Sequence, residues 1–147
     1  MRLLERVTAA VRGAAPDAAV FVRFSGTDAA DGGWDIDDTV RAAQRVAAAG
    51  SDLVDISSGG LVPHQSIQPG PGYQVPLAEK VRRETGILVA AVGMIDDAHL
   101  AESVVAEGRA DAVLSAREWL RDPHYALRAA VELGVDVPAP AQYLRAY

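Results

Sequence analysis

The sequence predicts an α/β fold made of four consecutive strand and helix units around a parallel sheet. Five glycines, at positions 13, 50, 86, 108 and 134, follow helical stretches, where a left-handed residue ends a helix. Short apolar runs come after the first four of these glycines. The runs are too continuously apolar for a sheet with one face in water, so we expect parallel strands covered on both faces.

The expected elements alternate along the chain after a short N-terminal helix. The four strands are expected at residues 20–25, 53–57, 88–92 and 112–115. Apolar residues recur at helical spacing after the first and third strands: Val40, Ala43, Ala47, Leu100 and Val104. Pro76 fits the first turn of a helix that runs to Thr85, and Asp96 is expected to be the N-cap of a helix over 97–107. The alternation predicts parallel pairing through right-handed crossovers.

Two architectures fit this alternation, an open doubly wound sheet or part of a (β/α)₈ barrel. A complete barrel needs roughly 250 residues, whereas this chain has 147 residues and four units. The sequence therefore favours half of a TIM barrel, formed as a single domain over residues 1–147.

The composition excludes several classes of protein. Apolar residues make up 50% of the chain and charged residues 23%, which is typical of a globular protein rather than a disordered one. The net charge of −6 argues against a nucleic-acid or anionic-membrane surface, and the lack of cysteine excludes disulfides and thiolate metal sites. Neither a signal peptide nor a run of ~18 apolar residues is present, so we expect a cytoplasmic protein. His64, His99 and His124 lack metal-ligand spacing, so we expect them at the solvated surface and expect no metal site.

Arg23 is a candidate binding residue within the first strand. Alternation places Phe21, Arg23 and Ser25 on one face of the sheet. One interpretation is that Arg23 bonds to Asp55 on the neighbouring strand. The other is a fixed cation at the mouth of a site, where it stabilises an anionic ligand or an electron-rich ring.

The remaining candidates follow the other strands, where α/β folds place their binding residues. Ser58 and the two glycines after it allow a ligand to approach the backbone, with a hydroxyl as donor. The loop from there to Gly72 has about 15 residues, which suits either a functional lid or a surface excursion. Gly93 follows the third strand and Ala116 and Arg117 follow the fourth, where barrels often bind phosphate.

Seven ordered segments carry a family resemblance. They are Val20-Phe21-Val22-Arg23, Asp55-Ile56-Ser57-Ser58-Gly59, Pro71-Gly72-Tyr73-Gln74-Val75-Pro76, Ala91-Val92-Gly93-Met94-Ile95, Gly108-Arg109-Ala110-Asp111, Ala116-Arg117-Glu118 with Arg121-Asp122-Pro123, and Pro140-Ala141-Gln142-Tyr143-Leu144-Arg145. Together they resemble the Old Yellow Enzymes, and most closely the thermophilic-like subclass of these NADH:flavin oxidoreductases. The resemblance extends from about residue 3 to the end of the chain.

The resemblance implies an FMN-binding TIM barrel, of which this chain is similar to strands five to eight. It implies that Arg23 contacts the pyrimidine edge of the flavin, and that Ala116 and Arg117 lie at the FMN phosphate with Gly93 nearby. Arg145 resembles the arginine that this subclass inserts into a neighbouring subunit's active site. Ala116 stands where the family usually has glycine, and Tyr147 where tryptophan is common.

The resemblance also implies that the N-terminal half of the barrel is missing. In the family that half supplies the substrate-anchoring pair and the tyrosine proton donor, so we expect no catalytic residue in this chain. The first hypothesis is a C-terminal portion of an FMN-dependent NAD(P)H oxidoreductase of the ene-reductase type, with a complementary half-barrel chain as a partner and homo-oligomers as the expected state. The alternatives are a non-catalytic half-barrel homodimer that binds a phosphorylated small molecule, and a truncated remnant without activity. Arg23 distinguishes the first hypothesis from the two alternatives, because we expect it to have a role only if a flavin lies over it.

Overall fold

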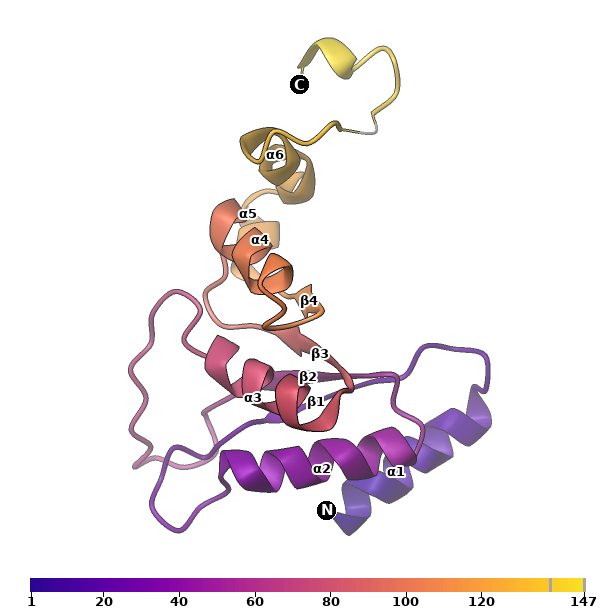
Figure 1. Cartoon of the computed structure of the whole chain (residues 1–147), viewed down its shortest axis with the longest axis vertical. Helices are drawn as coiled ribbons and strands as arrows, with labels where there is room; N and C mark the ends of the chain where they lie inside the picture. The colour runs from indigo at the N-terminus through magenta and orange to yellow at the C-terminus, as the bar shows by residue number, and fades with distance from the viewer. Residues whose placement is uncertain (138, 147) are drawn as a thin grey trace.

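The computed structural model describes residues 1–137 and 139–146, and its centre is a four-stranded parallel sheet (Figure 1). The strands are β1 (Phe21–Ser25), β2 (Leu53–Ser57), β3 (Leu88–Ala91) and β4 (Ala112–Val113), in the spatial order β1-β2-β3-β4. The expected strands and their parallel pairing are therefore confirmed, although β4 is shorter than predicted. The register places Arg23 opposite Asp55 and Asp55 opposite Ala90.

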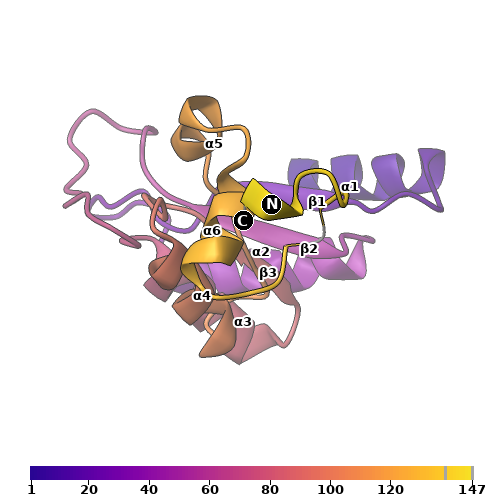
Figure 2. The same ribbon diagram turned by 90° about the horizontal axis from the view of Figure 1, so that it is seen from above.

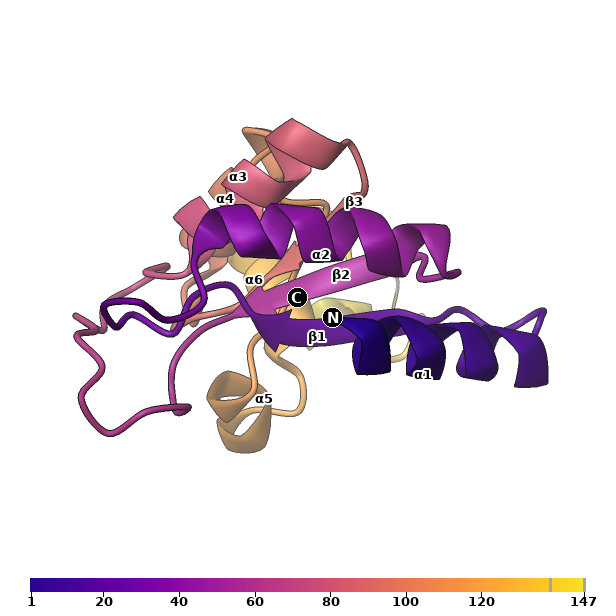
Figure 3. The same cartoon turned by 90° about the horizontal axis from the view of Figure 1, so that it is seen from below.

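Helices surround this sheet, and most of them pack on one face. They are α1 (Arg2–Ala14), α2 (Ile36–Ala48), α3 (Val75–Thr85), α4 (Ala98–Ala106), α5 (Arg117–Arg121) and α6 (Tyr125–Glu132), followed by the 3₁₀ helix η1 (Leu144–Ala146). Figures 2 and 3 show α2, α3 and α4 on one side of the strands and α5 on the other, with α1 alongside β1. α5 is not expected from the sequence, because five residues are too few to show a helical period.

The apolar core lies between the sheet and these helices. Ile56 and Val89 of the sheet pack with Val46 of α2, Val81 of α3 and Val104 of α4, and all five are fully buried. Such valine-rich strands match the buried parallel sheet that the sequence predicted.

The opposite face of the sheet is open in the part of the chain that the structure describes. Phe21 is 65% exposed and Leu88 is 53% exposed, and both side chains belong to the same face as Arg23 and Asp55. The expectation that both faces are covered is therefore wrong for this chain, because every helix that packs on the core contributes to the other face.

Two helix ends differ from those predicted from the sequence. Gly86 ends α3 in the left-handed conformation, as predicted, but Gly13 lies inside α1, which continues to Ala14. The N-cap of α4 is Asp97, whose side chain accepts a hydrogen bond from the Leu100 N–H at 2.8 Å, and not Asp96. The carboxylate of Asp96 is thus free for the interactions described below.

Within residues 1–137 and 139–146, no helix combines the length and apolar character that crossing a membrane requires.

Candidate functional site

A cavity of about 350 Å³ lies at the carboxyl ends of the strands. Its size falls within the range of small-molecule pockets, about 300–1,000 Å³. It brings together four of the residues predicted from the sequence: Arg23, Gly93, Ala116 and Arg117. Ser57, Val92 and Leu114 also line it, so together with Arg23 of β1 all four strands of the described sheet contribute to the cavity. This is the position at which parallel α/β folds bind their ligands.

The cavity is lined on one side by Gln74, a residue for which the sequence predicted no role. Gln74 is 4% exposed, and its Nε2 lies 2.9 Å from Ser58 Oγ and 2.8 Å from Tyr73 Oη. A Cβ atom on Gly93 would come within 2.9 Å of Gln74 Oε1, so this close approach requires glycine. Ser58 is therefore held through Gln74 and does not itself line the cavity.

Hydrogen-bond donors gather where β3 and β4 end. In the described residues, the N–H groups of Gly93, Met94, Ala116 and Arg117 donate to no protein acceptor. The Arg117 side chain is exposed and forms no ion pair with any residue that the structure describes. Backbone N–H groups beside a guanidinium are the donors that a phosphate group prefers.

Met94 has a φ of +55° beside these donors. A long side chain rarely adopts this left-handed conformation, which costs on the order of 1–3 kcal/mol. Strain of this kind is typical of functional sites, so its occurrence next to Gly93 supports a binding role for this turn.

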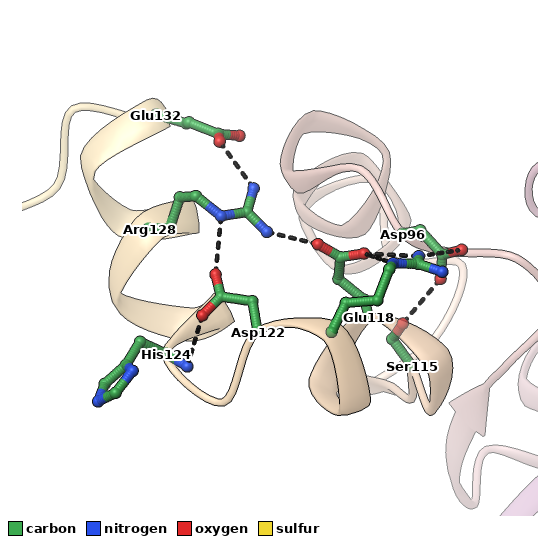
Figure 4. A network of polar contacts seen from close by, with 8 residues as sticks. Asp96, Ser115, Glu118, Asp122, His124, Arg128 and Glu132 are labelled. Atoms are coloured by element: carbon green, nitrogen blue, oxygen red, sulfur yellow. Dashed lines mark hydrogen bonds and ion pairs between the residues drawn. The ribbon is translucent and has the colours of Figure 1, made fainter.

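Asp96 brings a negative charge to the same cavity, and two neighbours compensate it. Its carboxylate accepts a hydrogen bond from Ser115 Oγ at 2.8 Å and lies 3.3 Å from Arg121 Nη2 (Figure 4). The Arg121 guanidinium has a raised pKa, chiefly because it donates a hydrogen bond to Glu118. Arg121 therefore stays charged and compensates the Asp96 carboxylate. Among the described residues, the uncompensated positive charge at this end of the cavity is that of Arg117.

The network in Figure 4 continues from Glu118 to α6. Arg128 donates to Glu118, to Asp122 at 2.9 Å and to Glu132 at 3.0 Å. The pKa of Asp122 is lowered, chiefly by the hydrogen bond from Arg128. The ion pairs thus connect the loop after β3 to α5 and then to α6.

Arg23 forms the ion pair with Asp55 that the sequence left as one of two interpretations. Its Nε donates to Asp55 Oδ2, and the Asp55 side chain is 9% exposed while that of Arg23 is 53% exposed. The expectation that Arg23 has a role only beneath a flavin is therefore wrong, because Arg23 neutralises a buried carboxylate. Its two Nη groups have no partner among the described residues, and the side chain also lines the cavity.

The other predicted residues lie elsewhere. Arg145 belongs to η1, is exposed, and lies on the C-terminal segment that extends away from the sheet (Figure 1). Tyr147 lies outside the described residues. All three histidines are exposed, and residues 1–137 and 139–146 hold no group of three or more His, Cys, Asp or Glu suited to a metal ion.

Comparison with curated proteins and with a family model gives consistent results. The family model described as "NADH:flavin oxidoreductase / NADH oxidase family" matches residues 1–135. The NADPH dehydrogenases of Bacillus subtilis (strain 168) and Geobacillus thermodenitrificans (strain NG80-2) are 46% and 47% identical over 131 residues. The match covers 89% of this chain and 38% of each relative, so the chain spans well under half the length of these proteins.

Solved structures give the same architecture. The 2-naphthoyl-CoA reductase complex with 2-naphthoyl-CoA has a TM-score of 0.77 and 26% identity, over 91% of this chain and 21% of that chain. Histamine dehydrogenase from Rhizobium sp. 4-9, at 23% identity, has a TM-score of 0.72 over 90% of this chain and 19% of that one, and shows the fold alone. Both neighbours are TIM-barrel oxidoreductases, which confirms the predicted half-barrel.

Proposed function

The chain belongs to the NADH:flavin oxidoreductase / NADH oxidase family, and from this premise we propose that its cavity binds FMN as one wall of the cofactor site of an FMN-dependent NAD(P)H oxidoreductase. The observation that carries the proposal is the set of free N–H donors beside Arg117 at one end of the cavity, with Arg23 at the other. Bound FMN would supply the chemistry of hydride transfer from NAD(P)H to an activated alkene, and the protein would bind and orient the reactants.

The phosphate end of this site lies within the chain. The N–H groups of Gly93, Met94, Ala116 and Arg117 donate to the phosphate oxygens, and the Arg117 guanidinium supplies the compensating charge. Ala116 is exposed, so the methyl group that it carries in place of the family's glycine leaves this turn accessible.

Arg23 serves the ring end. The ion pair with Asp55 fixes its Nε, and the two Nη groups remain free to donate to the polar edge of the ring. A fixed cation at that position stabilises negative charge on the ring. Asp55 is thus a positioning residue for Arg23.

The proposal assigns the substrate-anchoring pair and the tyrosine proton donor of the family to parts of the barrel outside the residues described, and it assigns Arg145 to the active site of a neighbouring subunit in a homo-oligomer.

Titration of the purified chain with FMN and with riboflavin tests the cofactor assignment. The proposal expects FMN to bind more tightly, because only FMN carries the phosphate. No quenching of flavin fluorescence and no calorimetric signal at high micromolar FMN would show that the cavity is not a cofactor site.

A second candidate function is a phosphate-binding module without redox chemistry. It is favoured by the fact that this chain lines the phosphate end of the cavity, whereas the sheet face beside Arg23 is open. Competition separates the two functions. A simple phosphate monoester that displaces FMN with equal affinity supports the module, and strong preference for FMN supports the flavoprotein.

A further inference from the structure

The side-chain amide of Gln74, which is almost fully buried, has a fixed orientation. Its Nε2 lies 3.2 Å from the Ser58 carbonyl oxygen, 2.9 Å from Ser58 Oγ and 2.8 Å from Tyr73 Oη. A backbone carbonyl can only accept a hydrogen bond, so the NH₂ group of Gln74, and not its Oε1, must face Ser58.

This orientation decides what the Tyr73 hydroxyl can do. An amide NH₂ group has two hydrogens, and here one goes to Ser58 and the other to Tyr73 Oη. The Tyr73 oxygen is therefore an acceptor toward Gln74, and its own proton points away from that amide. In the part of the chain that the structure describes, this proton has no protein acceptor. Tyr73 lines the cavity, so its O–H group is available to a ligand bound there.

Tyr73 lies beside the turn that supplies part of the proposed phosphate site, because both of its neighbours in sequence contact Gly93. The Gly72 N–H donates to the Gly93 carbonyl at 2.8 Å. A Cβ atom on Gly93, whose φ is +118°, would lie 3.1 Å from Gln74 Cβ. The N–H groups of Gly93 and Met94 belong to the same turn and donate to no described residue. The Tyr73 hydroxyl is therefore one hydrogen bond away from an amide that packs on this turn.

We propose that the Tyr73 hydroxyl is a further donor of the phosphate site and gives its hydrogen bond to a phosphate oxygen of the ligand. Gln74 is a positioning residue, because it holds the Tyr73 oxygen as an acceptor and so keeps the hydroxyl proton for the ligand. A donor that is already oriented loses less conformational entropy on binding than a freely rotating one. The inference rests on the proposed function for the identity of FMN as the ligand, but not for the contacts of Tyr73 and Gln74.

A purely structural role for these contacts would have a different signature. Gln74 joins Ser58, the residue after β2, to the start of α3. If the contacts only held this loop in place, their loss would lower stability and weaken the binding of every flavin alike. Donation to the phosphate instead predicts a loss of affinity that requires the phosphate.

Calorimetric titration of Tyr73→Phe with FMN and with riboflavin tests the inference. The substitution keeps the ring and removes only the hydroxyl. We expect the affinity for FMN to fall by about tenfold or more, as for the loss of a hydrogen bond to a charged group, while the affinity for riboflavin stays unchanged. Tyr125→Phe is the matched control, because the Tyr125 hydroxyl has no partner among the described residues and does not line the cavity.

Gln74→Met tests the positioning role. Methionine has a similar length but no donor, so the Tyr73 hydroxyl is free to rotate away from the ligand. We expect FMN binding to weaken by about fivefold. Adding Tyr73→Phe to Gln74→Met should then cost less than Tyr73→Phe costs in the parent chain, because both changes act through the same hydroxyl. Circular dichroism melts check that each variant is folded, and if Gln74→Met is not, Tyr73→Phe decides alone.

An unchanged affinity of Tyr73→Phe for FMN would overturn the inference, and so would an equal loss for FMN and riboflavin. Titration of the parent chain distinguishes these results from failure of the proposed function. If the parent chain prefers FMN to riboflavin and Tyr73→Phe has no effect, the inference alone fails. If the parent chain binds inorganic phosphate but no FMN, and Tyr73→Phe weakens phosphate binding, the proposed function alone fails. Binding of neither ligand by the parent chain overturns both.

Discussion

The Asp96 carboxylate accepts a hydrogen bond from the Ser115 hydroxyl at 2.8 Å, which joins the turns that follow β3 and β4. Both residues line the cavity. The bond therefore fixes the spacing between the N–H groups of Gly93 and Met94 and those of Ala116 and Arg117.

Ser115→Ala tests whether this spacing matters for the phosphate. Losing one hydrogen bond costs about 1 kcal/mol, or about fivefold in affinity, and we expect that loss for FMN while riboflavin binding stays unchanged. Calorimetry measures both affinities. Ser103→Ala on α4, whose hydroxyl bonds to the Leu100 carbonyl, is the control. A loss of riboflavin affinity equal to that of FMN would contradict the prediction.

Arg117→Ala should weaken FMN binding more severely. A hydrogen bond to a charged group contributes about 1.5–3 kcal/mol, so we expect a decrease of about tenfold to a hundredfold. Riboflavin again serves as the ligand without phosphate. Arg83→Ala removes an exposed arginine from α3, away from the cavity, and should leave both affinities unchanged. If Arg117→Ala weakens the binding of FMN and of riboflavin to the same extent, the phosphate of FMN binds elsewhere.

Arg23→Leu should lower the free energy of unfolding by about 2 kcal/mol, because it leaves the buried Asp55 carboxylate without its partner. We expect less than the cost for a fully buried pair, since the Arg23 side chain is half exposed. Urea denaturation measures the loss. The double variant Arg23→Leu with Asp55→Asn should recover most of it, and failure to recover would show that the Arg23 side chain stabilises the sheet by packing alone.

Asp111→Asn should make the free energy of unfolding depend less on pH in the acidic range. Burial of the Asp111 carboxyl raises its pKa, but hydrogen bonds from Arg82 and from the Val89 N–H outweigh this effect, so the pKa is lowered from 3.8. A lowered pKa in the folded state stabilises the protein above pH 3.8, and this contribution is lost as the pH falls through the folded value.

The Asp111→Asn variant should therefore be less stable than the parent chain at pH 7, and the difference should shrink below pH 3.8. Thermal melts across this range measure it. The exposed Asp17 provides the control, since Asp17→Asn should show no such convergence.

Local patterns were sufficient to predict the strands, because β1, β2 and β3 are short apolar runs between helices. Pro76 was also a reliable signal, since its ring suits only the first turn of a helix. The resemblance placed Arg23, Gly93, Ala116 and Arg117 at the strand ends, and the cavity contains all four.

Interactions between distant residues explain what the sequence could not predict. Asp96 and Asp97 are equivalent as N-caps in the sequence, and the choice depends on Ser115 and Arg121, which bind Asp96 from far along the chain. Gly13 did not end its helix, because Arg12 holds the following segment through the carbonyls of Pro16 and Ala18 at 3.0 and 2.7 Å. The open sheet face could not be predicted from local patterns, because it depends on which side of the sheet each helix packs.

The positions of the two tryptophans give the chain two separate optical reporters. Trp34 lines an apolar cleft at the β1 edge, where its Nε1 donates to Thr39 Oγ1 at 2.6 Å. Trp119 lies on α5, the helix that begins at Arg117, with its ring edge-to-face on Tyr125 at 5.8 Å. In a Trp119→Phe variant, a blue shift of the emission would report closure of the barrel edge, and in a Trp34→Phe variant quenching would report the arrival of flavin. Partner docking and cofactor binding can therefore be followed independently, without an added label.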